Sequence, residues 1–370
     1  MSDFAMVLFR YFPQGGLQTD FLRVLAECTR RGHPVTVFCG DWEKEAAFPP
    51  GARLEMLPCT GSSNALRAIR FQRHFMTRLE TCRFDLILGF NKMAGLDLYF
   101  AADSCFAAEH DDFFSRVCNP RCRIFRAMER EIFAPDSRTK ILALTERQKE
   151  EYRKIYRTPE ERFLIVPPGV SPACRRPAGT EKTGAARKKI REEFHLPEDA
   201  VLLLEIGSSF RTKGVDRNLR AWRKLPANVH LLVAGREKHR TYEKLARSLG
   251  VEDRVHFAGP RNDVPELLFA ADALVHPARK EAAGNVLAEA LAAGIPVVCT
   301  AACGYAPLVQ KAGGLVLPEP FVQEAWERML EKLLSSLPER KKQAEKSSSE
   351  TDLYRRAEII VDEMERMCRK

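Results

Sequence analysis

The chain reads Glu281-Ala282-Ala283-Gly284-Asn285-Val286-Leu287-Ala288-Glu289 between two apolar segments, residues 274–277 and 294–300. This pattern predicts a buried strand, a turn, a helix that begins inside the quoted interval, and then a second buried strand. At about 1.5 Å of rise per helical residue, the two glutamates are roughly 12 Å apart. That length matches the distance from the hexose to the ribose of a nucleotide sugar, so one carboxylate can hold each end.

The residues between the two glutamates favour a diphosphate in the middle of such a ligand. The small residues Ala282, Ala283 and Gly284 let a ligand approach the backbone. The unpaired N–H groups and the positive dipole of the new helix attract an anion. The alternative is that Glu281 is only a helix N-terminal carboxylate and Glu289 a charge on a solvated helix face. The surrounding strand, turn, helix and strand favour the ligand-binding interpretation.

The first half of the chain predicts a parallel sheet with helices on both faces. A strand at residues 5–9, a helix at 17–31 and a strand at 35–38 form an opening βαβ unit. Further strands are expected at residues 54–57, 85–89, 98–101 and 141–145. Gly15 and Gly16 lie between strand and helix as in a phosphate-binding loop, but the three-glycine fingerprint of dinucleotide sites is missing. The sequence therefore argues against a nicotinamide cofactor.

The second half repeats the α/β pattern. Strands at residues 201–206, 230–234, 255–258 and 273–276 alternate with helices at 215–225, 242–249 and 265–270. At 370 residues the chain exceeds what one core usually supports, so two domains are expected. We predict one domain over residues 1–168, completed by a C-terminal helix within 351–370, and a second over 169–350. Within the second, residues 171–191 are expected to form a link and a solvated basic loop, and 340–349 an exposed crossing.

Three further stretches narrow the assignment. They are Tyr11-Phe12-Pro13-Gln14-Gly15-Gly16-Leu17-Gln18 with Asp20, residues 89–103, and Gly259-Pro260-Arg261-Asn262-Asp263-Val264. Together with the two-glutamate stretch they resemble the retaining glycosyltransferases of family 4. The likeness extends over residues 7–354. It is strongest to the branch that moves glucose from UDP-glucose to a heptose of the lipopolysaccharide core. It implies the GT-B fold, in which two Rossmann-like parallel-sheet domains face each other across a cleft.

The resemblance assigns Lys213 to the leaving diphosphate. A retaining transfer must stabilise the negative charge that grows on this group, and a fixed ammonium does so well. The alternative is a solvated loop lysine. The family pattern also places an arginine directly before this lysine, where this chain has Thr212 after Arg211. Either Arg211 supplies the missing cation or the diphosphate has one cation fewer.

The remaining site residues follow from the same likeness. Arg261 or its neighbours' backbone faces the nucleotide, unless it merely binds Asp263 in a surface turn. Asp20 is an acceptor-side carboxylate or a helix cap, and Asp103 orients the acceptor or the hexose or is structural. The catalytic candidates are Lys213, Glu281, Asp103 and Asp20. The donor-binding candidates are Gly15, Gly16, Arg211, Arg261, Ala283, Gly284, Asn285 and Glu289.

Neither a metal nor a cofactor is expected. The chain lacks an Asp-x-Asp motif, which the other large glycosyltransferase fold uses to bridge a metal to the diphosphate. Cys118 with Cys122, and Cys299 with Cys303, have a spacing that a metal site tolerates, but no further ligands accompany them. The odd number of cysteines, eleven, favours buried free thiols over disulfides. The resemblance implies front-face attack, in which the departing phosphate oxygen takes the acceptor's proton and the anomeric configuration is retained.

The net charge of +9 favours a polyanionic partner. No nucleic-acid-binding motif is present, which leaves a lipid-linked saccharide acceptor and an anionic membrane surface. No apolar run is long enough to cross a membrane, so a cytoplasmic protein is expected. Residues 115–130 predict a basic amphipathic helix, with Arg123, Arg126 and Arg130 on one stripe and Phe125, Met128 and Ile132 on another. It either lies on the inner membrane or packs its apolar face on the first domain.

Two rival functions remain open from the sequence. The first is the same fold with another nucleotide hexose or another saccharide acceptor. The second is a non-catalytic sugar-nucleotide sensor, which the departure at Thr212 makes conceivable. The presence of Lys213, Glu281 and Glu289 argues against the sensor.

Overall fold

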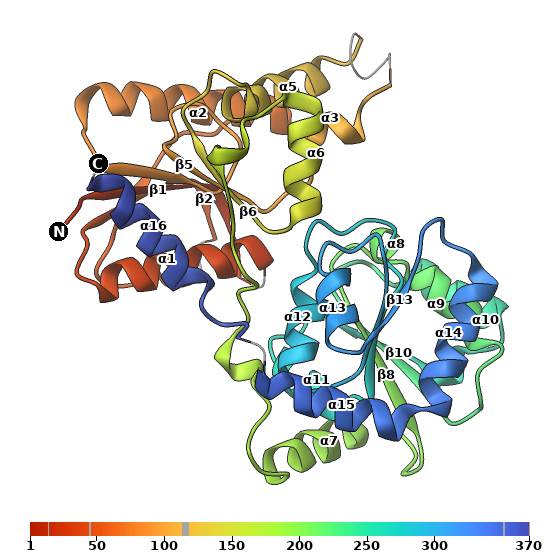
Figure 1. Ribbon diagram of the computed structural model, residues 1–370. Helices are drawn as coiled ribbons and strands as arrows, with labels where there is room; N and C mark the ends of the chain where they lie inside the picture. The colour runs from red at the N-terminus through yellow and green to blue at the C-terminus, as the bar shows by residue number, and fades with distance from the viewer. Residues whose placement is uncertain (14, 44–45, 113–117, 351, 370) are drawn as a thin grey trace. The chain divides into compact units, whose positions relative to one another are not determined.

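The computed structural model describes residues 1–13, 15–43, 46–112, 118–350 and 352–369 (Figure 1). The chain divides into two compact α/β units. Residues Met1–Gly169 and Arg355–Lys370 form the first, and Val170–Tyr354 form the second. The predicted division, after residues 168 and 350, differs from the observed one by one residue at the first crossing and by four at the second.

The first unit is built on a seven-stranded sheet in which every described strand pair is parallel. The strand order is β3-β2-β1-β4-β5-β6-β7. The interior strand β1 is almost wholly buried, as expected for a parallel strand covered on both faces. The strands are β1 (Phe4–Tyr11), β2 (Val35–Trp42), β3 (Arg53–Met56), β4 (Leu86–Gly89), β5 (Leu98–Ala101), β6 (Lys140–Ala143) and β7 (Phe163–Ile165).

Helices cover both faces of this sheet (Figure 1). One face carries α2, α5 and α6, whose buried side chains, among them Phe75, Ile132 and Tyr152, form one core with the sheet. The other carries α1 and α16, which pack against each other. The helices of the unit are α1 (Gly16–Arg30), α2 (Asn64–Thr81), α3 (Phe106–Glu109), α5 (Pro120–Phe133), α6 (Glu146–Tyr156) and α16 (Arg356–Cys368).

A buried ion pair fastens α16 to α1. Arg356 Nη1 donates to Asp20 Oδ2 at 2.6 Å, and the two side chains are 2% and 4% exposed. Arg356 Nε also donates to the carbonyl oxygen of Pro167 at 2.7 Å. The last helix of the chain is therefore an integral part of the first unit.

The second unit contains a six-stranded parallel sheet with the order β10-β9-β8-β11-β12-β13. Strands β8 and β11 are its two central neighbours. The strands are β8 (Val201–Ile206), β9 (Val229–Ala234), β10 (Val255–Gly259), β11 (Ala273–His276), β12 (Val297–Thr300) and β13 (Leu315–Leu317). The helices are α7 (Glu181–Glu193), α8 (Phe210–Lys213), α9 (Val215–Trp222), α10 (Arg240–Ser248), α11 (Val264–Ala270), α12 (Asn285–Ala292), α13 (Ala306–Lys311), α14 (Gln323–Ser335) and α15 (Leu337–Glu350).

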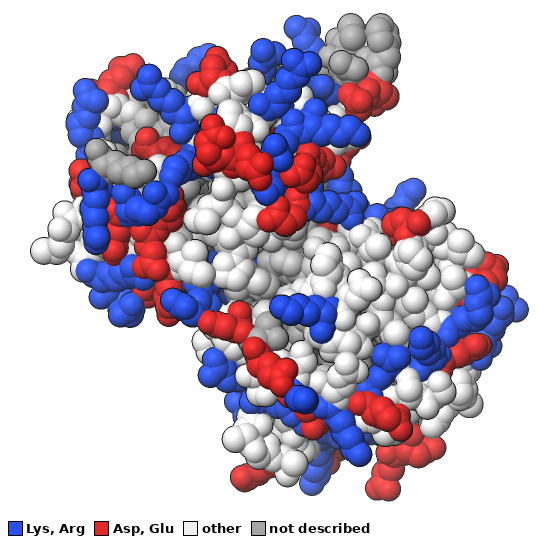
Figure 2. Space-filling model, in the orientation of Figure 1, with Lys and Arg blue, Asp and Glu red and all other residues white. Residues whose placement is uncertain are grey.

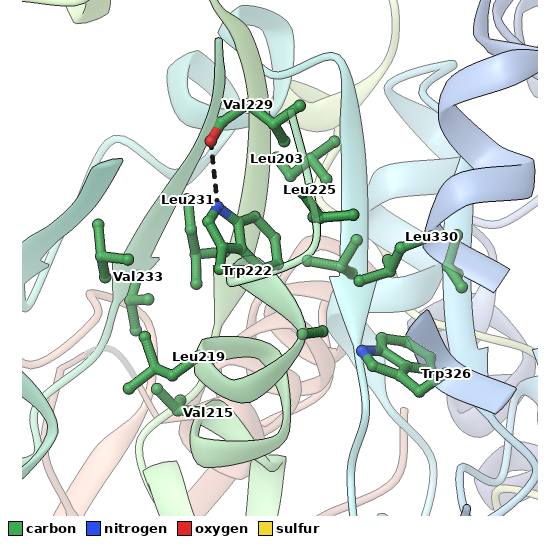
Figure 3. Packing of buried hydrophobic residues seen from close by; sticks show 14 of the residues in the cluster. Leu203, Val215, Leu219, Trp222, Leu225, Val229, Leu231, Val233, Trp326 and Leu330 are labelled. Atoms are coloured by element: carbon green, nitrogen blue, oxygen red, sulfur yellow. Dashed lines mark hydrogen bonds between the residues drawn. The ribbon is translucent and has the colours of Figure 1, made fainter. Parts of the chain in front are cut away.

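Two fully buried tryptophans anchor one face of this sheet (Figure 3). Trp222 Nε1 donates to the carbonyl oxygen of Val229 at 3.2 Å. Trp326 Nε1 donates to Asn218 Oδ1 at 2.9 Å. Both indoles thus combine a large apolar contact with a satisfied N–H group. This packing holds α9 against the sheet, and with it the preceding loop.

Two segments predicted as loops are helical. Residues 181–193 form α7 instead of a solvated basic loop, and residues 337–350 form α15 instead of an exposed crossing. Each helix buries only two side chains, Ala186 with Ile190 and Leu337 with Ala344. The helical periodicity of apolar residues is therefore too sparse to detect in these charged segments. The C-terminal helix expected within residues 351–370 spans Arg356–Cys368.

Candidate functional site

The two-glutamate stretch folds as predicted, with the helix beginning inside it. Strand β11 ends at His276, a turn carries Glu281, and α12 begins at Asn285. Gly284 precedes the helix with φ +97°, a conformation that favours glycine. A Cβ atom at this position would also lie 3.2 Å from Glu281 Cγ. Glu289 lies in the second turn of the helix.

A second loop, between β8 and α9, carries Lys213. Lys213 is the last residue of the short helix α8, and Gly214 follows with φ +86°. A Cβ atom on Gly214 would collide with the carbonyl oxygen of Pro277, and one on Gly207 would collide with the Lys213 side chain. The two glycines therefore let this loop lie against the end of β11.

These two loops bring Lys213 and Glu281 together, 68 positions apart in sequence. Lys213 Nζ forms an ion pair with Glu281 Oε2, and each side chain is 17% exposed. His276 Nε2 lies 3.4 Å from the same carboxylate oxygen. Burial alone would raise the pKa of Glu281, but His276 and Lys213 lower it to about 2. The carboxylate is therefore ionised at neutral pH.

The loop after β12 supports the Glu281 turn through its backbone. Gly304 N donates to the carbonyl oxygen of Glu281 at 3.0 Å, and Tyr305 N to that of Ala283 at 2.8 Å. Thr300 Oγ1 donates to the carbonyl oxygen of Ala278 at 2.7 Å. Sequence reasoning missed this support because backbone hydrogen bonds leave no signature in residue type.

Arg279 clamps the Lys213 loop to the Glu281 turn. Its guanidinium makes two hydrogen bonds to the carboxylate of Asp216, at 2.7 and 2.8 Å, and one to the carbonyl oxygen of Arg211 at 2.7 Å. Thr212 Oγ1 accepts a hydrogen bond from Ser209 Oγ at 3.0 Å, while Arg211 is exposed. A compensating role for Arg211 at the diphosphate stays a prediction.

The side chain of Arg261 is held in a turn, as the alternative predicted. Arg261 Nε donates to Asp263 Oδ1 at 2.8 Å, and Nη2 to Asp263 Oδ2 at 2.6 Å. Nη2 also donates to Glu193 Oε2 at 3.0 Å. Two carboxylates therefore share this guanidinium, and the backbone of the loop is the remaining candidate for a nucleotide contact.

Two of the predicted residues of the first unit mark the start of α1. Gly15 is the N-cap and Gly16 the first helical residue, and their proposed approach to a phosphate stays a prediction. Asp20 lies inside the helix, so the capping interpretation is wrong. Its carboxylate is instead buried against Arg356. This ion pair accounts for the burial of Asp20 and gives it a structural role.

Asp103 lines a cavity of about 510 Å³ in the first unit. The cavity lies at the carboxyl ends of β1, β4 and β5, where ligands bind in open α/β sheets. Its walls combine the aromatic rings of Phe9 and Phe106 with the polar side chains of Asn91 and Lys92. Aromatic surfaces with a few polar groups are typical of small-molecule sites.

A buried carboxylate supports the wall of this first-unit cavity. Glu129 is fully buried and accepts hydrogen bonds from Lys92 Nζ at 2.6 Å, from Tyr156 Oη at 2.7 Å, and from the backbone N–H groups of Phe106 and Ala107. Glu129 belongs to the predicted basic helix but does not lie on its solvated face. Its partners come from three separate segments, the loop after β4, α3 and α6, so no local pattern in the sequence indicates this role.

The predicted basic helix exists as α5, and its apolar face packs on the first unit. Met128, Ile132 and Phe133 belong to the unit's core. Arg123 and Arg130 are exposed, and basic side chains are visible on this part of the molecule in Figure 2. Arg126 Nη1 donates to the carbonyl oxygen of His110 at 3.0 Å. Residues 115–117 of the predicted segment lie outside the described residues.

Within the part of the chain that the structure describes, no helix is both long and apolar enough to span a bilayer. Among the same residues, no three His, Cys, Asp or Glu side chains are grouped as they are in a metal site.

Comparison with known proteins places the chain in a family. Residues 14–173 match the model of "Glycosyltransferase Family 4", and residues 186–350 match that of "Glycosyl transferases group 1". The chain is 41% identical to the lipopolysaccharide glucosyltransferase WaaG of Escherichia coli K12, over 97% of each protein. A crystal structure of WaaG superposes with a TM-score of 0.91 at 39% identity, covering 98% of this chain and 99% of the other. HepE from Anabaena, crystallised with UDP and glucose, shares the fold at 16% identity, with a TM-score of 0.76 over 99% of this chain and all of the other. The chain therefore belongs to the family 4 glycosyltransferases, and its two parallel sheets form the GT-B fold.

Proposed function

We propose that the protein is a retaining glycosyltransferase that moves glucose from UDP-glucose to a heptose of the lipopolysaccharide core. The observation that carries this proposal is the meeting of Lys213 and Glu281 at the carboxyl ends of β8 and β11, beside the start of α12. The chain is 41% identical to a lipopolysaccharide glucosyltransferase over nearly its full length, which supports the choice of substrates.

In this proposal the second unit binds the donor. Glu289 accepts hydrogen bonds from the ribose hydroxyls, and the N–H groups of Ala283, Gly284 and Asn285 face the diphosphate. Glu281 binds a hydroxyl of the hexose. Lys213 leaves its ion pair with Glu281 and stabilises the charge that grows on the leaving UDP. The departing phosphate oxygen takes the acceptor's proton as the new bond forms on the same face of the sugar.

We place the acceptor sugar in the first-unit cavity. Asp103 and Asn91 offer polar contacts to its hydroxyl groups, and the rings of Phe9 and Phe106 offer apolar surface. Arg67 and Arg121 also line this cavity and suit the negative charges of a lipid-linked saccharide.

The direct test is transfer of glucose to a purified core acceptor that ends in heptose. We expect release of UDP and an α-linked product by NMR, since retention keeps the donor's configuration. A β-linked product would contradict the retaining mechanism. Nucleotide binding without UDP release, with or without acceptor, would favour a sugar-nucleotide sensor. A panel of other nucleotide hexoses controls for the choice of donor.

Ligand-induced stabilisation provides a prediction that needs no acceptor. UDP-glucose is expected to raise the melting temperature, and UDP alone is expected to give most of the rise, because ribose and diphosphate supply most of the proposed contacts. Differential scanning fluorimetry measures both. GDP is the control, and equal stabilisation by GDP and UDP would exclude a preference for uridine.

Peripheral membrane binding is a further expected property. The exposed Arg123 and Arg130 on α5 should attract anionic lipid, with each arginine contributing roughly 1 kcal/mol. We expect salt-sensitive co-sedimentation with anionic vesicles, weakened by Arg123→Glu with Arg130→Glu. Lys244→Glu with Arg247→Glu on α10 makes the same change in charge on the second unit and serves as the control. Equal binding by both double variants would show that α5 is not the contact.

A further inference from the structure

His276 is a buried histidine whose place in the site is not explained by packing alone. It ends β11 in the middle of the sheet and is fully buried. Among the described residues, neither ring nitrogen meets a hydrogen-bond partner with good geometry. The contact of Nε2 with Glu281 Oε2, at 3.4 Å, is long for a hydrogen bond. Buried polar groups are normally bonded, so this ring calls for a partner.

Glu281 offers that partner when the ion pair with Lys213 opens. Lys213 and His276 contact the same oxygen, Oε2, so they compete for one acceptor. A diphosphate that attracts the ammonium of Lys213 would leave Glu281 with one strong contact fewer. A mostly buried carboxylate without a partner is costly. His276 is already within reach and needs only a small movement to form a hydrogen bond.

We propose that His276 is a positioning residue for the donor hexose, which holds the Glu281 carboxylate in place and ionised while Lys213 stabilises the diphosphate. The inference rests on the proposed function, because it assigns a hexose hydroxyl to Glu281. It adds to the proposed donor site a residue that touches neither the sugar nor the nucleotide.

The charges around the ring agree with this role. The groups that face His276 electrostatically are Glu281, Lys213 on α8, Cys303 after β12 and Glu205 on β8. Burial by itself lowers the pKa of His276, but Glu281 and Cys303 together outweigh it and the net direction is upward, with Lys213 acting against it. When Lys213 moves to the diphosphate, it no longer lowers the pKa of His276. The imidazole then holds a proton more readily and replaces the lost positive charge beside Glu281.

Two of these neighbours could also titrate. Hydrogen bonding to Cys299, together with the charge of His276, lowers the pKa of the Cys303 thiol to about 7. Burial raises the pKa of Glu205 to about 8, although its hydrogen bond from Asn218 acts the other way. Both pKa values lie well above that of Glu281, so Cys303 and Glu205 are mostly protonated at acidic pH.

The test compares the affinities for UDP and UDP-glucose by isothermal titration calorimetry. The ratio of the two dissociation constants isolates the contribution of the hexose. His276→Ala is expected to weaken UDP-glucose about tenfold, the cost of one hydrogen bond to a charged group, and to leave UDP within about twofold. Glu281→Gln is expected to lose a similar amount. The double variant should then lose no more than Glu281→Gln alone, because the two residues act as a unit.

Acidification gives a readout that a merely structural role would not move. His276 helps to hold the pKa of Glu281 low, so its removal raises that pKa and the carboxylate protonates at higher pH. The terminal phosphate of UDP itself protonates at about pH 6, so the ratio of each variant is compared with that of the wild type at the same pH. Relative to the wild type, the hexose contribution of His276→Ala should fall from about pH 6.5 to about pH 5. His276→Gln keeps an N–H donor, so it should recover affinity but still show the pH shift. If His276→Ala does not fold, the pH profile of His276→Gln decides whether the inference about His276 stands.

The matched control is His256→Gln, a histidine on β10 of the same sheet outside the site, which should leave the ratio unchanged. An unchanged ratio and a pH profile parallel to that of the wild type in the His276 variants would overturn the inference, as would additive losses with Glu281→Gln. These results presuppose a wild type that binds UDP-glucose. A wild type that binds no UDP-sugar would instead reject the proposed function.

Discussion

Lys213→Ala is expected to reduce turnover by about a hundredfold or more, the typical cost of removing one group that stabilises developing negative charge. Lys213 ends the short helix α8 on a partly exposed loop, so the fold should survive its truncation. The ammonium is already placed beside Glu281, where the proposed diphosphate and hexose meet. Initial rates of UDP release at saturating donor, together with a thermal melt of each variant, measure the effect.

Arg211→Ala is the matched control for this prediction. It removes a cation from the same short helix, and Arg211 is exposed. A much smaller loss of rate is expected, unless Arg211 supplies the cation that the family places where this chain has Thr212. Comparable losses in the two variants would assign that role to Arg211. A Lys213→Ala rate close to the wild type would contradict the assignment of Lys213 to the leaving group.

Arg356→Ala is expected to destabilise the first unit by about 3–5 kcal/mol, because it removes the 2.6 Å charge partner of the buried Asp20 carboxylate, whose ion pair with Arg23 is longer, at 4.0 Å. The variant also removes the hydrogen bond to the carbonyl oxygen of Pro167. Hydrogen exchange measured by mass spectrometry over α1 and α16 should show faster opening of both helices. A method with this resolution is needed because a chain with two units need not unfold in one step.

The neighbouring Arg355→Ala is the control for Arg356. Its side chain is 58% exposed and pairs with Glu358, which is also half-exposed, so its removal should change little. Replacing both buried partners, by Asp20→Asn with Arg356→Leu, should cost less than Arg356→Ala, since no unpaired charge remains. Equal exchange rates in the Arg355 and Arg356 variants would show that the buried pair does not hold α16 in place.

The sequence predicts the two parallel sheets well, because buried parallel strands appear as short apolar runs separated by turns. Strand β8, for example, has the bounds that its apolar residues indicate. The same logic fails for α7 and α15. A helix that buries two side chains in an otherwise charged segment looks like a loop until its packing partner is known, as α11 is for α7.

The donor-side candidates are partly predictable for a related reason. Lys213 and Glu281 each follow a strand, and the carboxyl ends of neighbouring parallel strands lie at one edge of a sheet. The roles of Asp20, Glu129 and His276 are not predictable, because they depend on partners that no local pattern indicates. Asp20 is 336 positions from Arg356. A carboxylate in a helix looks the same in sequence whether it meets water, a substrate or a buried guanidinium.

The division of the chain into units has a consequence for the order in which the protein is made. The second unit is one continuous segment, Val170–Tyr354, whereas the first needs both Met1–Gly169 and α16. As the chain leaves the ribosome, the second unit is complete before the first, although the first begins earlier. Until Arg356 has been synthesised, the carboxylate of Asp20 lacks the guanidinium that it pairs with in the finished fold. The nascent first unit is therefore the part that is exposed longest to proteases and chaperones.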